Sequence, residues 1–162
     1  MKDISSHGPI AAAAVWCPDV TVATIVPRDG RFLIVEESVR GERVLNQPAG
    51  HLEPNESLVE AARRETLEET GWSVAIEHFI GVYQWTSPSG EHFLRFAFAG
   101  RALGHDPALP LDAGIVRAIW LDRGEIAASA ARPRSPLVLR CVDDFLAGTR
   151  LPLSTIQAVA QA

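Results

Sequence analysis

Residues 50–72 read GHLEPNESLVEAARRETLEETGW, and this stretch decides how the rest of the chain is interpreted. Its charged residues and glycines follow the pattern G-x5-E-x7-R-E-x-x-E-E-x-G. The seven positions are Gly50, Glu56, Arg64, Glu65, Glu68, Glu69 and Gly71. At average residue frequencies, such a coincidence has a chance on the order of 10⁻⁸ per window. The spacing therefore indicates a functional motif.

The second half of the motif is predicted to form a helix. No proline or glycine occurs between Ser57 and Thr70, and small and apolar side chains recur there at helical intervals. Asn55 or Ser57 can cap the start of this helix, and Gly71 follows its end.

Three glutamates converge on this helix. Glu65, Glu68 and Glu69 are related by i, i+3 and i+4 spacing, so their carboxylates lie within about one turn. Clustered like charges repel one another, and a hard divalent cation such as Mg²⁺ would turn that repulsion into binding. The loop around Gly50 would let a backbone carbonyl such as that of Ala49 approach the same ion. The alternative is a solvated helix carrying ordinary ion pairs.

The motif resembles the Nudix box, the signature of hydrolases that act on nucleoside diphosphates linked to another group. Thr66 and Trp72 occupy places where the family consensus has bulky aliphatic residues. The resemblance implies that Mg²⁺, or Mn²⁺, is the cofactor and that Glu65 and Glu69 ligate it, with Glu68 in the same cluster.

The same resemblance implies a supporting role for Arg64. It is expected to pair with Glu56 and so to brace the loop against the helix. Arg64 is therefore counted with Glu68 among the predicted catalytic residues.

Length and composition favour one enzyme domain. The chain has 162 residues, of which 47% are hydrophobic, and its formal net charge is −5. These values favour a folded chain that does not bind nucleic acid, and a negative protein that meets polyphosphates needs cations as intermediaries. The longest apolar run, residues 10–17, is too short to span a membrane, and no signal peptide is evident. We expect a cytoplasmic monomer or homodimer.

Three segments are expected along the chain. Residues 1–15 are predicted to be a poorly ordered arm, residues 16–150 the hydrolase domain and residues 151–162 a tail. Cys141 lies on one helical face with Leu137 and Phe145, which favours core packing.

The turn and strand signals predict an α/β fold. Residues 20–26 and 31–36 read as a hairpin around the turn at residues 28–30, and two further strands, 78–85 and 92–100, flank the turn at 87–90. Another strand is expected at 115–121. A short helix should follow Asp122, and a longer one should follow Ser135 and Pro136, with Ser135 as its cap. This order suggests a single-domain α/β/α sandwich, with a mixed sheet between the motif helix and the C-terminal helix.

The resemblance extends beyond the motif over most of residues 16–150. It points to the branch of bacterial Nudix phosphatases that release phosphate from nucleoside tri- and diphosphates and from thiamine-pyrimidine pyrophosphate. The segments that carry it include residues 46–53, 93–96 and 134–138. The substrate is then expected to be a phosphorylated small molecule.

Two arginines are candidate substrate-binding residues. Arg95 is an unusual charge within an apolar strand, and Arg134 precedes a predicted helix start, where phosphates bind readily. Each could instead face solvent. Trp85 and Tyr83 could stack on a base or pack internally.

The proposed chemistry is attack by water on phosphorus, assisted by the metal. Glu68 is our candidate for the general base, and Asp112 is the alternative. Glu91, beside a hairpin tip, is a weaker one. His51 could donate to phosphate.

The sequence is also compatible with three other functions. They are an ADP-ribose or dinucleotide pyrophosphatase, a pyrophosphatase that removes oxidised nucleotides, and a nucleotide-sensing module without turnover. The complete set of three glutamates favours an enzyme over the sensing module.

Overall fold

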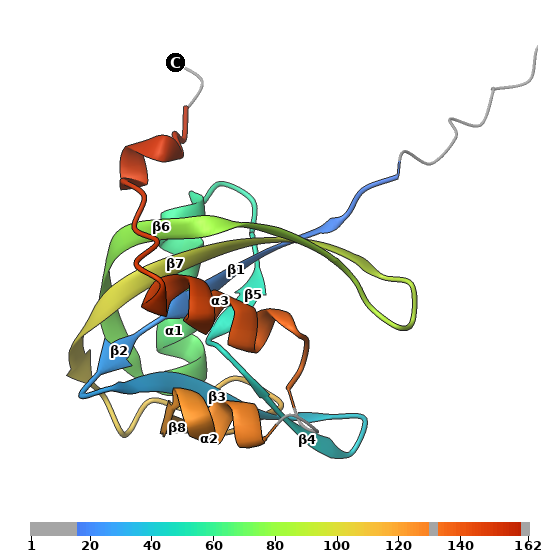
Figure 1. The fold of residues 1–162 in the computed structure, drawn as a ribbon, viewed down its shortest axis with the longest axis vertical. Helices are drawn as coiled ribbons and strands as arrows, with labels where there is room; N and C mark the ends of the chain where they lie inside the picture. The colour runs from blue at the N-terminus through green and yellow to red at the C-terminus, as the bar shows by residue number, and fades with distance from the viewer. Residues whose placement is uncertain (1–15, 130–132, 160–162) are drawn as a thin grey trace, which may run out of the picture.

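The computed structural model describes residues 16–129 and 133–159 (Figure 1). Within these ranges, eight strands form two four-stranded sheets, accompanied by three α-helices and one short 3-10 helix. The predicted N-terminal arm, residues 1–15, lies outside the described residues.

The first sheet is mixed and has the strand order β5-β1-β7-β6. β1 and β7 run parallel, whereas β5 and β6 pair antiparallel with their neighbours. Its strands are β1 (Asp19–Ile25), β5 (Ala49–His51), β6 (Trp72–Thr86) and β7 (His92–His105). β6 and β7 form a long hairpin whose tip projects from the body of the molecule (Figure 1). The predicted turn closes it, since the Gly90 N–H donates to the Ser87 carbonyl at 2.9 Å.

The second sheet is built on β3. This strand pairs with β8 along one edge and with β2 and β4 along the other. The strands are β2 (Pro27–Arg28), β3 (Arg31–Val39), β4 (Glu42–Asn46) and β8 (Ile115–Asp122).

The predicted hairpin between residues 20–26 and 31–36 is wrong in its strand pairing. The turn itself exists, because Asp29 and Gly30 have φ values of 52° and 75°, as a tight hairpin turn with two left-handed residues requires. However, β3 folds back on the two-residue β2, and β1 lies in the other sheet beside β7. β1 is buried on both faces over most of its length, a pattern that suits a central strand with a parallel neighbour.

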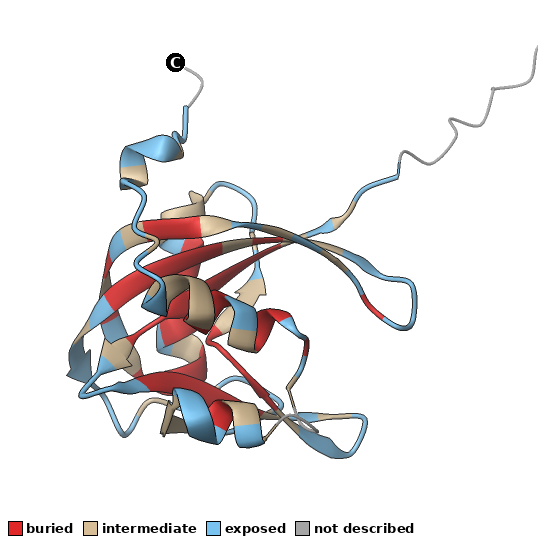
Figure 2. Cartoon of the chain, viewed as in Figure 1, coloured by how far each residue is buried: buried red, intermediate tan, exposed pale blue. Residues whose placement is uncertain are grey.

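Helices cover both faces of the sheets. α1 (Leu58–Thr70) packs into one apolar cluster, and α2 (Arg123–Ala128) and α3 (Leu137–Leu146) pack into a second cluster on the opposite side (Figure 1). Buried residues accordingly follow the strands and the sheet-facing sides of the helices (Figure 2). The predicted α/β/α architecture is confirmed, with the sheet divided into two.

In two of the three α-helices, the residue that caps the N-terminus is one that the sequence predicted. Ser57 caps α1 through a reciprocal capping box with Glu60, and Gly71 ends the helix with φ 69°. Asp122 caps α2 in the same way as Ser57. The predicted Ser135 cap of α3 is wrong, because Pro136 occupies the cap position and no side-chain cap bond is formed within the described residues.

Cys141 is fully buried beside Val138 and Val142, as predicted. After α3 the chain returns to the first sheet, where the backbone of Leu151 exchanges two hydrogen bonds of 2.9 Å with Phe79. The 3-10 helix η1 (Leu153–Thr155) follows. None of the described helices is long and apolar enough to cross a membrane.

Candidate active site

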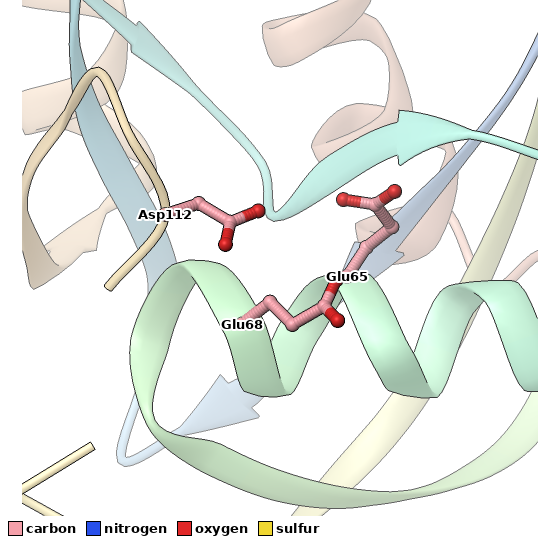
Figure 3. A group of neighbouring side chains, drawn as sticks. All are labelled: Glu65, Glu68 and Asp112. Carbon is pink, nitrogen blue, oxygen red and sulfur yellow. The ribbon is translucent and has the colours of Figure 1, made fainter. Parts of the chain in front are cut away.

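Three carboxylates gather at the C-terminal half of α1. Glu65 and Glu68 project from the helix, and Asp112 reaches them from the loop before β8 (Figure 3). One oxygen from each lies within 4.8 Å of the others. The loop is tied to the helix because the Asp112 N–H donates to the Glu68 carbonyl at 3.1 Å. The structure thus adds Asp112 to two of the predicted metal-binding residues.

Glu69 lies on the loop side of this group and is buried. Its Oε2 accepts a hydrogen bond of 2.8 Å from the Ala49 N–H, which connects α1 to β5. Glu69 therefore holds the loop in place, while its predicted part in metal ligation stays a prediction.

Burial raises the pKa values of two of these carboxyl groups. The pKa of Glu69 rises to about 8, because burial disfavours the charged form and the charges of Glu37, Glu65 and Asp112 add to the effect. Burial likewise raises the pKa of Glu65. A cation bound here would offset both penalties.

Arg64 binds the loop and the carboxylates together. Its guanidinium donates to both oxygens of Glu56, with Nη2···Oε1 at 2.7 Å and Nε···Oε2 at 3.0 Å. Its Nη1 also donates to Glu65 at 2.7 Å and to Glu68 at 3.0 Å, and Nη2 donates to the His51 carbonyl at 3.0 Å. The expected Arg64–Glu56 pair is present, and Arg64 additionally neutralises part of the acidic charge.

The glycine at the start of the motif has a steric cause. A Cβ atom at Gly50 would collide with the carboxylate of Glu65. Only a residue without a side chain lets the β5 backbone lie this close to the Glu65 carboxylate in its present position.

The donor set fits a hard divalent cation. Oxygen atoms from Glu65, Glu68 and Asp112 converge, and two neighbouring carboxylates are held in an environment that penalises their uncompensated charge. Mg²⁺ and Mn²⁺ favour such oxygen ligands, with open positions completed by water and phosphate.

A cavity of about 120 Å³ borders the β5 segment that packs against α1. Ala49, Gly50 and His51 form its border with the metal loop, and both predicted substrate-binding residues, Arg95 and Arg134, line it. Their side chains are thus brought together by β7 and by the segment before α3, which are far apart in the sequence.

Arg95 is the unusual member of this lining. Its side chain is buried, its Nη1 donates to Asn46 at 3.4 Å, and its Nε has no hydrogen-bond partner among the described residues. Burial lowers its pKa below the ordinary value. A buried guanidinium with an unused N–H is costly, so an anionic ligand would be favoured here.

Other unpartnered polar atoms line the same cavity. Thr21 Oγ1, Glu37 Oε1 and Ser135 Oγ are buried without a partner in the described part of the chain. Sequence reasoning did not select Thr21 or Glu37 and considered Ser135 only as a helix cap. Thr21 interrupts the apolar pattern of β1, a signal that could have identified it.

The other candidate residues from the sequence differ in where their side chains lie. Tyr83 packs internally, and its hydroxyl donates to Asp144 at 2.8 Å, so it is not free to stack on a base. Glu91 stands at the hairpin tip, where the Ser87 and Ser89 hydroxyls donate to it at 3.0 and 2.8 Å. His51 is exposed at the edge of the cavity, and Trp85 lines it.

Comparisons with known proteins agree on one family. A family model described as NUDIX domain matches residues 16–141. The chain is 46% identical over 139 residues to Phosphatase NudJ of Escherichia coli strain K12, a match that covers 86% of this chain and 90% of the relative.

Comparison with solved structures points to the same family. A NUDIX hydrolase from Nitrosomonas europaea superposes with a TM-score of 0.86 at 49% identity, covering 88% of this chain and 98% of that one. An ADP-ribose pyrophosphatase from Streptococcus suis superposes with a TM-score of 0.63, covering 83% and 96%, but at 13% identity this likeness concerns the fold alone.

Proposed function

Because the chain belongs to the NUDIX domain family and is a hydrolase, we propose that it is a Mg²⁺-dependent phosphatase. It releases orthophosphate from nucleoside tri- and diphosphates and from thiamine-pyrimidine pyrophosphate. The observation that carries this proposal is the cavity lined by Arg95, whose Nε has no partner among the described residues, and by Gly50, which lies against the carboxylate of Glu65. The anion site and the predicted metal ligands are then neighbours.

The metal would be held by Glu65 and by whichever of Glu68 and Asp112 does not act as base, with Glu69 beside them. When bound, a divalent cation neutralises phosphate oxygens and favours ionisation of an attacking water. Mn²⁺ is expected to substitute for Mg²⁺.

The chain's own residues orient the substrate and move the proton. Arg95 and Arg134 donate to phosphate oxygens, and Arg95 is held for this by Asn46. Glu68 is half-buried and only partly engaged by Arg64, so it can accept the proton of the attacking water. Asp112 is the alternative base, because it belongs to the same group of carboxylates.

The rival functions have less support. The likeness to an ADP-ribose pyrophosphatase is limited to the fold. A sensing module has no need of the complete carboxylate group.

The proposal is tested by separating the products formed from one nucleoside triphosphate. With Mg²⁺, the expected products are the diphosphate and then the monophosphate, with orthophosphate released each time. Chelator should abolish the reaction, and Mg²⁺ or Mn²⁺ should restore it. Pyrophosphate with monophosphate as the first products, or undiminished turnover in chelator, would defeat the proposal.

A further inference from the structure

The cavity lined by Arg95 and Arg134, here called the Arg95 cavity, also holds a carboxylate. Glu37 lines it from β3, although two arginines in the same lining favour an anionic ligand. Glu37 Oε1 is buried and has no hydrogen-bond partner in the described part of the chain. A buried carboxylate oxygen without a partner is costly, so its position beside a proposed phosphate site suggests a role there.

The course of β3 directs this carboxylate toward the cavity. Successive side chains of a strand point to opposite faces. Glu36 pairs with Arg117 at 2.8 Å, whereas Glu37 lines the cavity together with Asn46 from the neighbouring strand β4. The register between β3 and β8 shifts between Glu36 and Glu37, as at a β-bulge. Bulges often direct a side chain toward a functional site.

The charges of the lining partly cancel. Two arginines and one glutamate give it a formal charge of +1, with His51 neutral. Burial lowers the pKa of Arg95, the charge of Arg134 acts in the same direction, and the charge of Glu37 opposes them. The three charged groups are therefore close enough to influence one another.

This balance limits how tightly the cavity holds phosphate by itself. Two guanidinium groups without a counter-charge would bind any phosphate strongly, including the orthophosphate that the reaction releases. A carboxylate in the same buried space repels phosphate oxygens, and the repulsion is stronger there than in water. A phosphate chain that also reaches a cation on α1 gains a second attachment, which a single released phosphate lacks.

We propose that Glu37 sets the phosphate affinity of the Arg95 cavity, so that a phosphate chain is retained while it also contacts the cation on α1 and a single phosphate is released. Glu37 is then a specificity-determining residue that favours diphosphates and triphosphates over their products. This inference rests on the proposed function, but the affinity itself is measured without turnover.

Titration of inorganic phosphate into the protein in chelator, followed by calorimetry, tests the role of Glu37. Glu37→Gln keeps the shape of the side chain and removes its charge, so it should bind inorganic phosphate about tenfold more tightly than wild type. Glu37→Ala should also bind more tightly, so the test does not depend on the folding of one variant. Glu37→Asp keeps the charge and should stay near wild type. A damaged fold would not raise the affinity.

Glu42→Gln is the matched control, because it removes the same charge from an exposed position on β4. Its affinity for inorganic phosphate should equal that of wild type. Unchanged or weaker binding in both Glu37→Gln and Glu37→Ala overturns the inference. Equal strengthening in Glu42→Gln also overturns it, because the net charge of the protein would then be the cause.

Failure of the proposed function gives a different result. Wild-type protein that releases no orthophosphate from uridine diphosphate with Mg²⁺ defeats that function, while the titration in chelator still measures the effect of Glu37. In the active enzyme, added orthophosphate should inhibit Glu37→Gln about tenfold more strongly than wild type, for the same electrostatic reason. Equal inhibition of the two proteins would contradict the role of Glu37 in product release.

Discussion

At the scale of single residues, Arg64 connects the loop of the motif to its carboxylates. It donates to both oxygens of Glu56 on one side and to Glu65 and Glu68 on the other. The strong hydrogen bond from Arg64 lowers the pKa of Glu56. This arrangement makes Arg64 a positioning residue, since it acts through the loop and the carboxylates.

Arg64→Ala is expected to lower kcat/KM about 10- to 100-fold, as the loss of supports around metal sites commonly does. Glu56→Gln should have a similar effect because it breaks the same contact. The double variant should lose little more than either single one. Losses that multiply in the double variant would show that the two residues act independently. Arg63→Ala, at the exposed neighbouring position, is the matched control and should be near wild type.

Glu69 makes the stability of the metal-free protein depend on pH. Its pKa is about 8 in the folded protein, against an ordinary value of 4.5, so the folded state binds the proton more tightly. The stabilisation is complete below about pH 4.5 and is lost as pH rises toward 8, by on the order of 3 kcal/mol after allowance for partial solvation.

Denaturant unfolding in chelator, repeated from pH 5 to pH 8, measures this effect. The free energy of unfolding should fall across the range, and Glu69→Gln should flatten the curve, because an amide does not ionise. Mg²⁺ should counteract the fall at pH 8. A Glu69→Gln curve as steep as that of wild type would place the titration elsewhere.

At the scale of elements, the site depends on the close approach of β5 to α1. The Ala49 N–H bonds to Glu69, and Gly50 lies against the carboxylate of Glu65. Adding one methyl group at Gly50 must therefore move either the strand or the carboxylate.

Gly50→Ala is expected to reduce kcat/KM by about 10²-fold, because a shift near 1 Å in a catalytic group can cost that much. Metal affinity, measured by calorimetry, should fall in parallel. Gly104→Ala is the control, since a Cβ there meets nothing within 4 Å and the strand is exposed. Wild-type activity in Gly50→Ala would contradict the steric account.

Local signals in the sequence predicted the elements better than their pairing. The limits of α1 followed from Ser57 and Gly71, whose capping roles depend on neighbouring residues only. The strand that pairs with residues 20–26 could not be predicted from neighbouring residues in this way. The pairing depends on burial against β7, which lies about seventy residues away and leaves no local mark.

At the scale of the whole molecule, the site is assembled from segments that are distant in the chain. The motif supplied Glu65, Glu68, Glu69 and the Arg64–Glu56 pair, because their spacing lies within one helix and its loop. Predictions from the sequence could not place the other contributions, since their proximity follows from the packing of both sheets. These residues are Asp112, Thr21, Glu37, Trp85, Arg95 and Ser135.

The cavity lined by Arg95 and Arg134 borders the β5 segment that packs against α1, which gives the site a direction. A substrate that lies along it presents its terminal phosphorus to the carboxylates. The central claim is therefore that water attacks this phosphorus and no other.

Hydrolysis of a nucleoside triphosphate in ¹⁸O-labelled water tests this claim most directly, with mass spectrometry of all products after a single cleavage in the presence of Mg²⁺. We predict one labelled oxygen in orthophosphate and none in the nucleoside diphosphate. Label in the nucleotide, or in pyrophosphate, would contradict the account.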